Sequence, residues 1–252
     1  MRLKNERILL TGGSGGLGRC IAERLMKAGA EVTVLGRETA LAYQARVIAC
    51  DLSSADGIES AAETVAAEPW DGLINLAGVQ HFGPFEQQSA AHLLSTYMVN
   101  LVAPARLAQA VIPGMKARGR GRIVNVGSIF GSINFPHFAT YSSSKAGLHG
   151  LSQGLRRELA GSGVRVTYVA PRAVNTPFNS DLVLRFAKAT KMHMDDPKRV
   201  ARRIVRAMER CEGEVFLGFP ESFFVRVNAL APLIVDGALA AKNRRAAEFF
   251  SA

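Results

Sequence analysis

A tyrosine and a lysine four residues apart form the clearest chemical pair in this sequence of 252 residues. Tyr141 and Lys145 fall near the start of a stretch with helical composition, where residues at i and i+4 share a face. A phenol with a pKa of about 10 is a poor acid–base catalyst at neutral pH, and a neighbouring cation favours its phenolate. The pair could therefore transfer a proton through Tyr141, with Lys145 lowering the pKa of its hydroxyl. The alternatives are a half-buried aromatic at a helix start and a solvated lysine on a helix face.

A glycine-rich segment near the N-terminus predicts a phosphate-binding turn. The sequence TGGSGGLG at 11–18 follows an apolar run and opens a helical stretch, which is the context that a dinucleotide site requires. Glycines let the backbone approach a pyrophosphate, and the helix N-terminus favours its negative charge. A glycine-rich turn without a ligand is the alternative. The residues expected at the cofactor here are Gly12, Ser14, Gly16, Leu17 and Gly18.

The end of the second expected strand indicates which dinucleotide binds. NAD sites usually place Asp or Glu there to bind the adenosine ribose. This chain instead continues with Gly36 and Arg37, and a planar guanidinium suits a 2′-phosphate. The sequence therefore predicts NADP(H) as the cofactor, the alternative being an Arg37 that faces solvent beside Glu38.

The elements that position these residues follow from the alternation of short apolar runs with helical stretches, as in an α/β protein. This order predicts a doubly wound (Rossmann) parallel sheet between two layers of helices, in a single domain with a helical C-terminal extension. We expect the Rossmann domain at 1–220, with a substrate lid at about 176–196, and a tail at 221–252 packed on it. Strands are expected at 7–11, 31–35, 46–49, 72–75, 122–126, 164–169 and 214–218, and helices at 16–27, 55–68, 89–116, 142–160 and 197–210.

Several motifs together resemble those of the short-chain dehydrogenase/reductase family. The loop at 11–18 matches its TGxxxGxG pattern, and YSSSK at 141–145 matches its YxxxK. Ser128 precedes the tyrosine by 13 residues, the family's usual interval, and NLAG at 75–78 resembles its NNAG turn with Leu in place of the second Asn. The resemblance covers about residues 6–176 and implies an enzyme that interconverts a carbonyl compound and a secondary alcohol.

The resemblance also assigns roles to side chains. Tyr141 would act as general acid and base, Lys145 would lower its pKa and orient the nicotinamide ribose, and Ser128 would hold the substrate oxygen. Asn100 would hold a proton-relay water where the family's helix bulges. A non-catalytic NADP-binding regulatory protein is the alternative, and the intact catalytic residues argue against it. The further cofactor contacts that the resemblance implies are Asp51, Leu52, Asn75, Ala77, Gly78, Pro171, Val174 and Thr176.

Arg172 departs from the family pattern, because it takes the place of the glycine in PGxVxT. It either faces solvent or provides a cation for an acidic substrate group or for the cofactor pyrophosphate. His81 and His137 either line the substrate pocket or pack elsewhere, and the spacing of the histidines predicts no metal site. The lid predicts a substrate with an apolar portion because it carries Phe178, Leu182, Leu184, Phe186, Met192 and Met194.

The composition restricts partners and compartment. Lys and Arg number 31 against 21 Asp and Glu, so a net charge of +10 attracts anions, but no nucleic-acid-binding motif accompanies it. The 3 cysteines form no CxxC pair, which suits a reducing compartment, and the charged start at 1–7 lacks the apolar core of a signal peptide. We therefore expect a cytoplasmic protein that binds no nucleic acid.

Larger contacts are expected at two places. The resemblance implies a homodimer or homotetramer formed through the helices at 89–116 and 142–160. The tail at 223–250 mixes apolar with basic residues, which predicts amphipathic helices. These helices either pack over the substrate pocket and the subunit interface or lie on an anionic membrane. Pro232 and Asp236 interrupt the apolar run well short of the ~20 residues needed to cross a bilayer.

Overall fold

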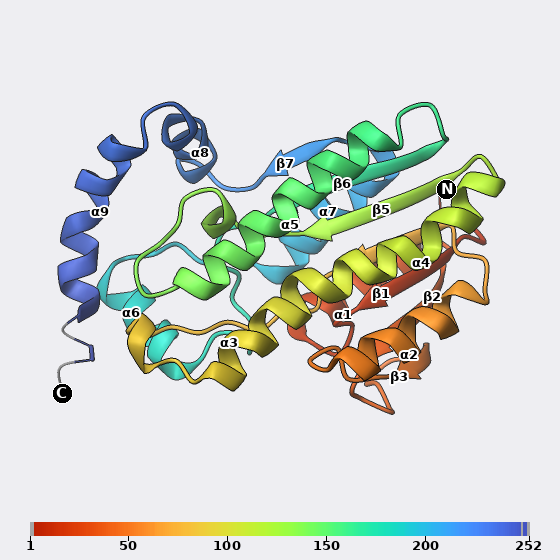
Figure 1. Ribbon diagram of the computed structural model, residues 1–252, viewed down its shortest axis with the longest axis horizontal. Helices are drawn as coiled ribbons and strands as arrows, with labels where there is room; N and C mark the ends of the chain where they lie inside the picture. The colour runs from red at the N-terminus through yellow and green to blue at the C-terminus, as the bar shows by residue number, and fades with distance from the viewer. Residues whose placement is uncertain (1–2, 248, 251–252) are drawn as a thin grey trace.

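Strands that are apolar on both faces must be buried between helices, and the central sheet of this protein is built from such strands. The computed structural model describes residues 3–247 and 249–250. Its sheet has seven parallel strands in the order β3-β2-β1-β4-β5-β6-β7 (Figure 1), which confirms the doubly wound fold predicted from the sequence. The strands are β1 (Arg7–Thr11), β2 (Glu31–Gly36), β3 (Arg46–Ala49), β4 (Gly72–Asn75), β5 (Gly121–Val126), β6 (Val164–Ala170) and β7 (Glu214–Phe216).

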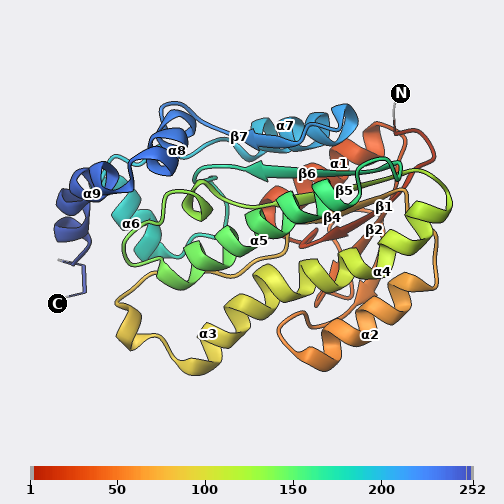
Figure 2. The same ribbon diagram turned by 45° about the horizontal axis from the view of Figure 1, so that its top comes forward.

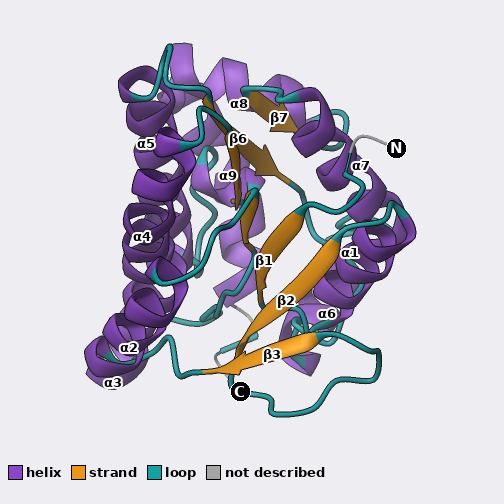
Figure 3. Cartoon of the chain, turned by 90° about the vertical axis from the view of Figure 1, so that its right-hand side faces the viewer, coloured by secondary structure: helices purple, strands orange, loops and turns teal. Residues whose placement is uncertain are grey.

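Helices cover both faces of the sheet. The pair α1 and α7 packs on one face, and α2, α4 and α5 pack on the other (Figure 3). One apolar core lies in each layer, and Trp70, the only tryptophan, is buried in the layer of α2 and α4. The helices of these layers are α1 (Gly16–Lys27), α2 (Ala55–Ala66), α4 (Ala103–Ala117), α5 (Ala139–Glu158) and α7 (Pro197–Arg210).

The helix expected at 89–116 is interrupted, so the prediction of one continuous helix is wrong. It begins as α3 (Ala90–Tyr97), passes through a π-helical turn at Met98–Val102 and continues as α4. Pro104 has no N–H to donate to the carbonyl of Asn100, which weakens the regular pattern at this point. π-helical turns of this kind often occur at functional sites, because they turn a side chain away from the helix surface.

Two predicted boundaries also shift. The helix expected at 142–160 begins at Ala139, so Tyr141 lies in its first turn. The last strand, expected at 214–218, ends at Phe216, because Gly218 adopts a left-handed backbone conformation with φ +95°. Both shifts are local effects of turns that the apolar pattern does not record.

Two segments near the C-terminus, the lid and the tail, extend past the end of the sheet. The lid segment contains α6 (Asp181–Ala189), and the tail forms α8 (Glu221–Leu230) and α9 (Pro232–Ala247), which lie beyond the strand ends in two views (Figures 1 and 2). The tail is less amphipathic than the sequence predicts, since Val235 is buried while its neighbours Leu233 and Ile234 are exposed. Within the described part of the chain, no helix has the length and apolar character needed to span a bilayer.

Candidate active site

A cavity of about 1120 Å³ opens at the carboxyl ends of β1, β4, β5 and β6. In a doubly wound sheet, ligands bind where the strand order reverses, which here is between β1 and β4. Asn75 and Asn100 are not among the described residues that line the cavity. The other side chains and backbone positions predicted for cofactor and catalysis do line it, namely Gly12, Ser14, Gly16, Leu17, Gly18, Arg37, Asp51, Leu52, Ala77, Gly78, Ser128, Tyr141, Lys145, Pro171, Val174 and Thr176.

The glycine-rich loop packs closely on its neighbours at two of its glycines. Gly12 has a φ of +72°, and a Cβ there would lie 2.9 Å from the backbone of Ala77. A Cβ on Gly18 would collide with the carbonyl oxygen of Gly12, so the first turn of α1 packs directly on the loop. Among the described residues, no side chain caps the N-terminus of α1, whose N-cap is Gly15. Its free amides therefore face the cavity as an anion site, and they fit a dinucleotide pyrophosphate.

Thr11 joins this loop to the turn after β4. Its Oγ1 accepts hydrogen bonds from the backbone N–H groups of Leu76 and Ala77, each at 3.0 Å. Tyr43, which the sequence analysis missed, donates from its hydroxyl to the carbonyl of Gly13 at 2.9 Å. These contacts fix two backbone segments on either side of the cavity floor.

The far end of the cavity carries two charged residues of opposite sign. Arg37 is exposed and follows β2, while Asp51 follows β3. The Asp51 carboxylate accepts from the backbone N–H of Ser53 at 2.9 Å and from its hydroxyl at 2.8 Å, and these bonds lower the pKa of Asp51. Asp51 is thus held on its own turn, and the charge of the exposed Arg37 guanidinium nearby lowers its pKa further.

The residues predicted to carry out proton transfer, Ser128, Tyr141 and Lys145, all line the cavity. Burial raises the pKa of Tyr141 to about 12, against the opposing effect of a hydrogen bond with Ser128. Lys145 Nζ donates to the carbonyl of Val126 at 3.0 Å and lies 5.9 Å from the centre of the Tyr141 ring. Burial also lowers the pKa of Lys145, to about 8. The sequence predicts that the lysine lowers the pKa of the phenol, whereas in the structure burial has the larger effect, because it penalises both charged forms.

Asn100 supports the site without lining it. Its side chain is fully buried in the π-helical turn, where Oδ1 accepts from the N–H of Val79 at 2.9 Å. Its Nδ2 donates to the carbonyl of Val79 and to the hydroxyl of Ser144, both at 2.9 Å. Asn100 therefore ties the turn after β4 to α5, one residue before Lys145.

Asn75, for which a cofactor contact is expected, turns its side chain away from the cavity. Its Nδ2 donates to Asn125 Oδ1 at 2.8 Å, between β4 and β5, and to the carbonyl of Pro104 at 3.4 Å. The side chain is buried, with 2% of its surface exposed. The periodicity of the strand explains this, because the last residue of a buried strand points into the layer of helices as readily as into the site.

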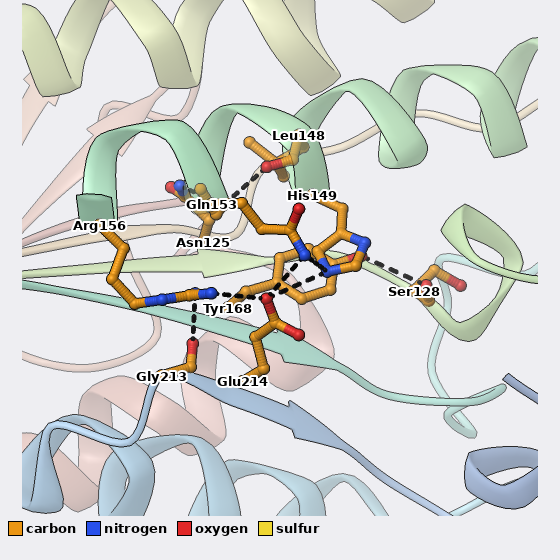
Figure 4. A network of polar contacts seen from close by, with 10 residues as sticks. Asn125, Ser128, Leu148, His149, Gln153, Arg156, Tyr168, Gly213 and Glu214 are labelled. Carbon is orange, nitrogen blue, oxygen red and sulfur yellow. Dashed lines mark hydrogen bonds and ion pairs between the residues drawn. The ribbon is translucent and has the colours of Figure 1, made fainter. Parts of the chain in front are cut away.

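A polar network lies beneath Ser128 (Figure 4), and no sequence motif predicted it. Tyr168 donates from its hydroxyl to the carbonyl of Ser128 at 3.5 Å. The His149 ring stacks on the Tyr168 ring, with centroids 4.4 Å apart. The Glu214 carboxylate accepts from Gln153 at 2.9 Å and from Arg156 at 2.8 Å, which lowers its pKa despite burial. The network links α5, β6 and β7 behind the turn that carries Ser128.

Arg172 does not face bulk solvent, which is one of the two environments expected for it. Its side chain is 13% exposed, and it forms ion pairs with Asp195 at 2.9 Å and Glu221 at 3.0 Å. It also donates to the carbonyl of Phe219 at 3.2 Å. Arg172 also lines the cavity, where two carboxylates offset its charge.

The substrate side of the cavity is apolar, but its lining differs from the expected set. Phe178 and Met192 line the cavity, whereas Phe186 is fully buried in an aromatic core and Leu184 is partly exposed. The described lining includes His193 but neither His81 nor His137. The tail supplies walls that no motif signalled, namely Phe219, Phe224, Val227, Ile234, Val235, Ala238 and Leu239.

Comparisons with known proteins agree with this geometry. A family model described as short chain dehydrogenase matches residues 6–185. The ketoacyl reductase HetN of Nostoc sp. strain PCC 7120 is 32% identical, over 93% of this chain and 88% of its own length. A short-chain dehydrogenase from Streptomyces avermitilis superposes with a TM-score of 0.77 at 29% identity, covering 96% of this chain and 98% of that one. A short-chain dehydrogenase from Sphingobium yanoikuyae in complex with NADPH superposes with a TM-score of 0.77 at 26% identity, covering 92% and 96%.

Proposed function

Since the chain belongs to the short-chain dehydrogenase family, we propose that it is an NADP(H)-dependent oxidoreductase that interconverts a carbonyl compound and a secondary alcohol. One observation carries the proposal. Ser128, Tyr141 and Lys145 face the same cavity as the free amides at the start of α1. A proton donor and a dinucleotide cradle that share one cavity can act on the same carbonyl group.

The chemistry follows from the positions of these groups. Bound NADPH supplies a hydride to the carbonyl carbon. Tyr141 gives its hydroxyl proton to the carbonyl oxygen, and Ser128 donates a hydrogen bond to that same oxygen. Lys145 holds the nicotinamide ribose and, as a cation, offsets the negative charge that develops on Tyr141. In the reverse direction the phenolate of Tyr141 takes the proton of the alcohol.

NADP(H) is proposed over NAD(H) because of Arg37. This exposed guanidinium follows β2 and lines the cavity, at the place where an NAD site carries a carboxylate. A 2′-phosphate accepts charge-assisted hydrogen bonds from such a group. The related structure with bound NADPH supports the proposal.

The substrate that we propose carries a sizeable apolar portion. Phenylalanine, valine, leucine and isoleucine side chains from the lid, α8 and α9 form the wall opposite the glycine-rich loop. Apolar walls with few polar groups select by shape and by burial of apolar surface. The proposed assembly is a homodimer that leaves this wall open, formed through α4 and α5.

The test is cofactor oxidation by the purified full-length protein with a panel of ketones and aldehydes. We expect NADPH to be consumed with bulky apolar carbonyl compounds and Tyr141→Phe to lower kcat by at least a hundredfold, while NADPH still binds. Tyr97→Phe is the matched control, since its hydroxyl bonds Ser143 at an exposed site and it is not among the described cavity residues. Cofactor binding without turnover on any carbonyl would favour a regulatory protein.

A further inference from the structure

The entrance of the cavity is surrounded by exposed apolar side chains. Phe178, Phe219, Phe224 and Ile234 each line the cavity and are also exposed, Phe219 by 80% and Ile234 by 68%. We call these four residues the apolar rim. Large exposed apolar groups that gather at one site mark a surface that contacts another apolar phase.

The apolar surface continues past the rim onto the turn between α8 and α9. Leu230 and Leu233 are 88% and 81% exposed, and they are not among the described residues that line the cavity. Both helices lie at the end of the molecule beyond the sheet, where they face outward (Figures 1 and 2). The tail thus covers the cavity with one side and presents apolar side chains to the surroundings with another.

A groove of strongly positive charge adjoins the rim. It measures about 500 Å³, and Arg199, Arg202, Arg203 and Arg206 of α7 line it together with Phe219 of the rim. The sequence of α7, PKRVARRIVRAMER, carries a single acidic residue. The exposed side of α7 is therefore basic along its length. We call this site the arginine groove.

Most of the charge in the groove is not offset by carboxylates. Arg203 pairs with Glu212 at 2.6 Å, and Arg172, at the edge of the groove, pairs with Asp195 and Glu221. Within the described residues, Arg199, Arg202 and Arg206 form no ion pair, although Arg206 is close enough to Glu212 to help lower the pKa of that carboxyl. Their charge is therefore available to anions that approach from solvent.

We propose that the apolar rim and the arginine groove dock this protein on an anionic lipid bilayer, with the mouth of the cavity against the lipid. The bilayer presents negative headgroups to the arginines and an apolar phase to Phe219 and the leucines. Charge complementarity of this kind and an adjoining apolar surface are the two features that peripheral membrane binding requires. Compared with a second copy of this chain or an acidic protein, only a bilayer binds both surfaces while leaving the cavity open.

The position of the rim argues against the other two partners. A second copy of this chain, or an acidic protein seated on the groove and rim, would cover Phe219, Phe224 and Ile234 and so obstruct the entrance. A lipid surface covers the same side chains while an apolar solute still passes from the bilayer into the cavity. This step rests on the proposed function, because it assumes an apolar carbonyl substrate.

The test is flotation of the full-length protein with vesicles of phosphatidylcholine alone and of phosphatidylcholine mixed with phosphatidylglycerol. We expect binding to the anionic vesicles, weaker binding at higher salt, and little binding to the neutral ones. The double variant Arg202→Gln and Arg206→Gln should lose at least tenfold in binding, since each basic residue contributes separately. Lys116→Gln with Arg157→Gln, at the ends of α4 and α5 on the other face of the sheet, forms the matched control and should stay within about twofold.

The apolar part is tested separately. Leu230→Ser with Leu233→Ser should also lower vesicle binding by about tenfold or more, because two exposed leucines no longer enter the lipid. Phe85→Ser with Leu94→Ser is its control, as these residues are 58% and 63% exposed on the opposite side of the cavity and are not among its described lining. NADPH oxidation with a water-soluble ketone should be unchanged in the leucine double variant and in its control.

Three results would overturn the docking proposal. Absence of binding to anionic vesicles would leave an acidic protein as the partner, and equal losses in the test and control variants would show a general effect of charge or apolarity. A change from oligomer to monomer in the leucine variant, measured by light scattering, would show that a second copy covers this surface. Vesicle binding without turnover on any carbonyl would instead overturn the proposed function and leave the docking surface standing.

Discussion

The Arg172 guanidinium donates to both carboxylate oxygens of Asp195, from Nε at 2.9 Å and from Nη2 at 3.0 Å. Its Nη1 donates to Glu221 at 3.0 Å. The three residues come from the end of β6, the end of the lid and the start of α8. Arg172 therefore joins the lid and the tail to the sheet, and these are the two segments that form the apolar wall of the cavity.

Loss of this link should lower stability. Arg172→Ala is expected to reduce the free energy of unfolding by about 2 kcal/mol, because it leaves two partly buried carboxylates without their partner. Arg19→Ala breaks only an exposed pair with Glu23 and should leave the free energy of unfolding nearly unchanged. Denaturant unfolding of both variants measures the difference, and equal effects would mean that Arg172 does not hold the lid.

The rate of carbonyl reduction should depend on pH through Lys145. Burial lowers the pKa of Lys145 to about 8 and raises that of Tyr141 to about 12, so the phenol stays protonated at neutral pH while the lysine loses its charge above about 8. We expect kcat/KM for reduction to be level below pH about 7 and to fall above about 8. Alcohol oxidation needs the phenolate, so its rate should still be rising at pH about 10, because the pKa of Tyr141 is raised to about 12. A reduction profile that stays level up to pH about 10 would exclude this assignment.

Cofactor preference should depend on Arg37. Arg37→Ala is expected to weaken NADPH binding by about tenfold to a hundredfold, which corresponds to the loss of charge-assisted hydrogen bonds to the phosphate. NADH binding should change by less than about twofold. Fluorescence titration of both cofactors measures the two constants. Two results would show that Arg37 does not contact the phosphate. One is an equal loss of affinity for NADPH and NADH in the variant, and the other is equal affinity for both cofactors in the unmodified protein.

Self-association should depend on two glycines on the exposed face of α5. A Cβ added at Gly150 or Gly154 meets no described atom within 4 Å, so the helix offers a surface of small residues that a second helix can approach closely. Gly154→Leu is expected to convert the proposed dimer to a monomer, and the substitution also favours the helix itself. Gly237→Leu in α9 has equally open surroundings and is the control. Light scattering should give a dimer for the unmodified protein and for the control.

The sequence determined the fold and the location of the site because both rest on local patterns. Alternating apolar and helical stretches predict a parallel sheet, and the glycine-rich turn after β1 can work only at the edge where that sheet binds ligands. Tyr141 and Lys145 lie four residues apart on one helix, so their common face also follows from the sequence. The sequence also shows that Arg172 replaces the family's glycine, although it does not show what Arg172 contacts.

The tertiary structure decided every feature that depends on partners distant in the sequence. Arg172 pairs with residues 23 and 49 positions away, and Asn100 bonds to Ser144, 44 positions away. The pKa of Tyr141 rises because helices and strands from the whole chain exclude water around it, and no spacing of residues measures that exclusion. The tail that forms the apolar wall carries no motif, because a wall needs only apolar side chains of suitable size. Only the packing of α8 and α9 shows which of these side chains face the cavity and which face outward.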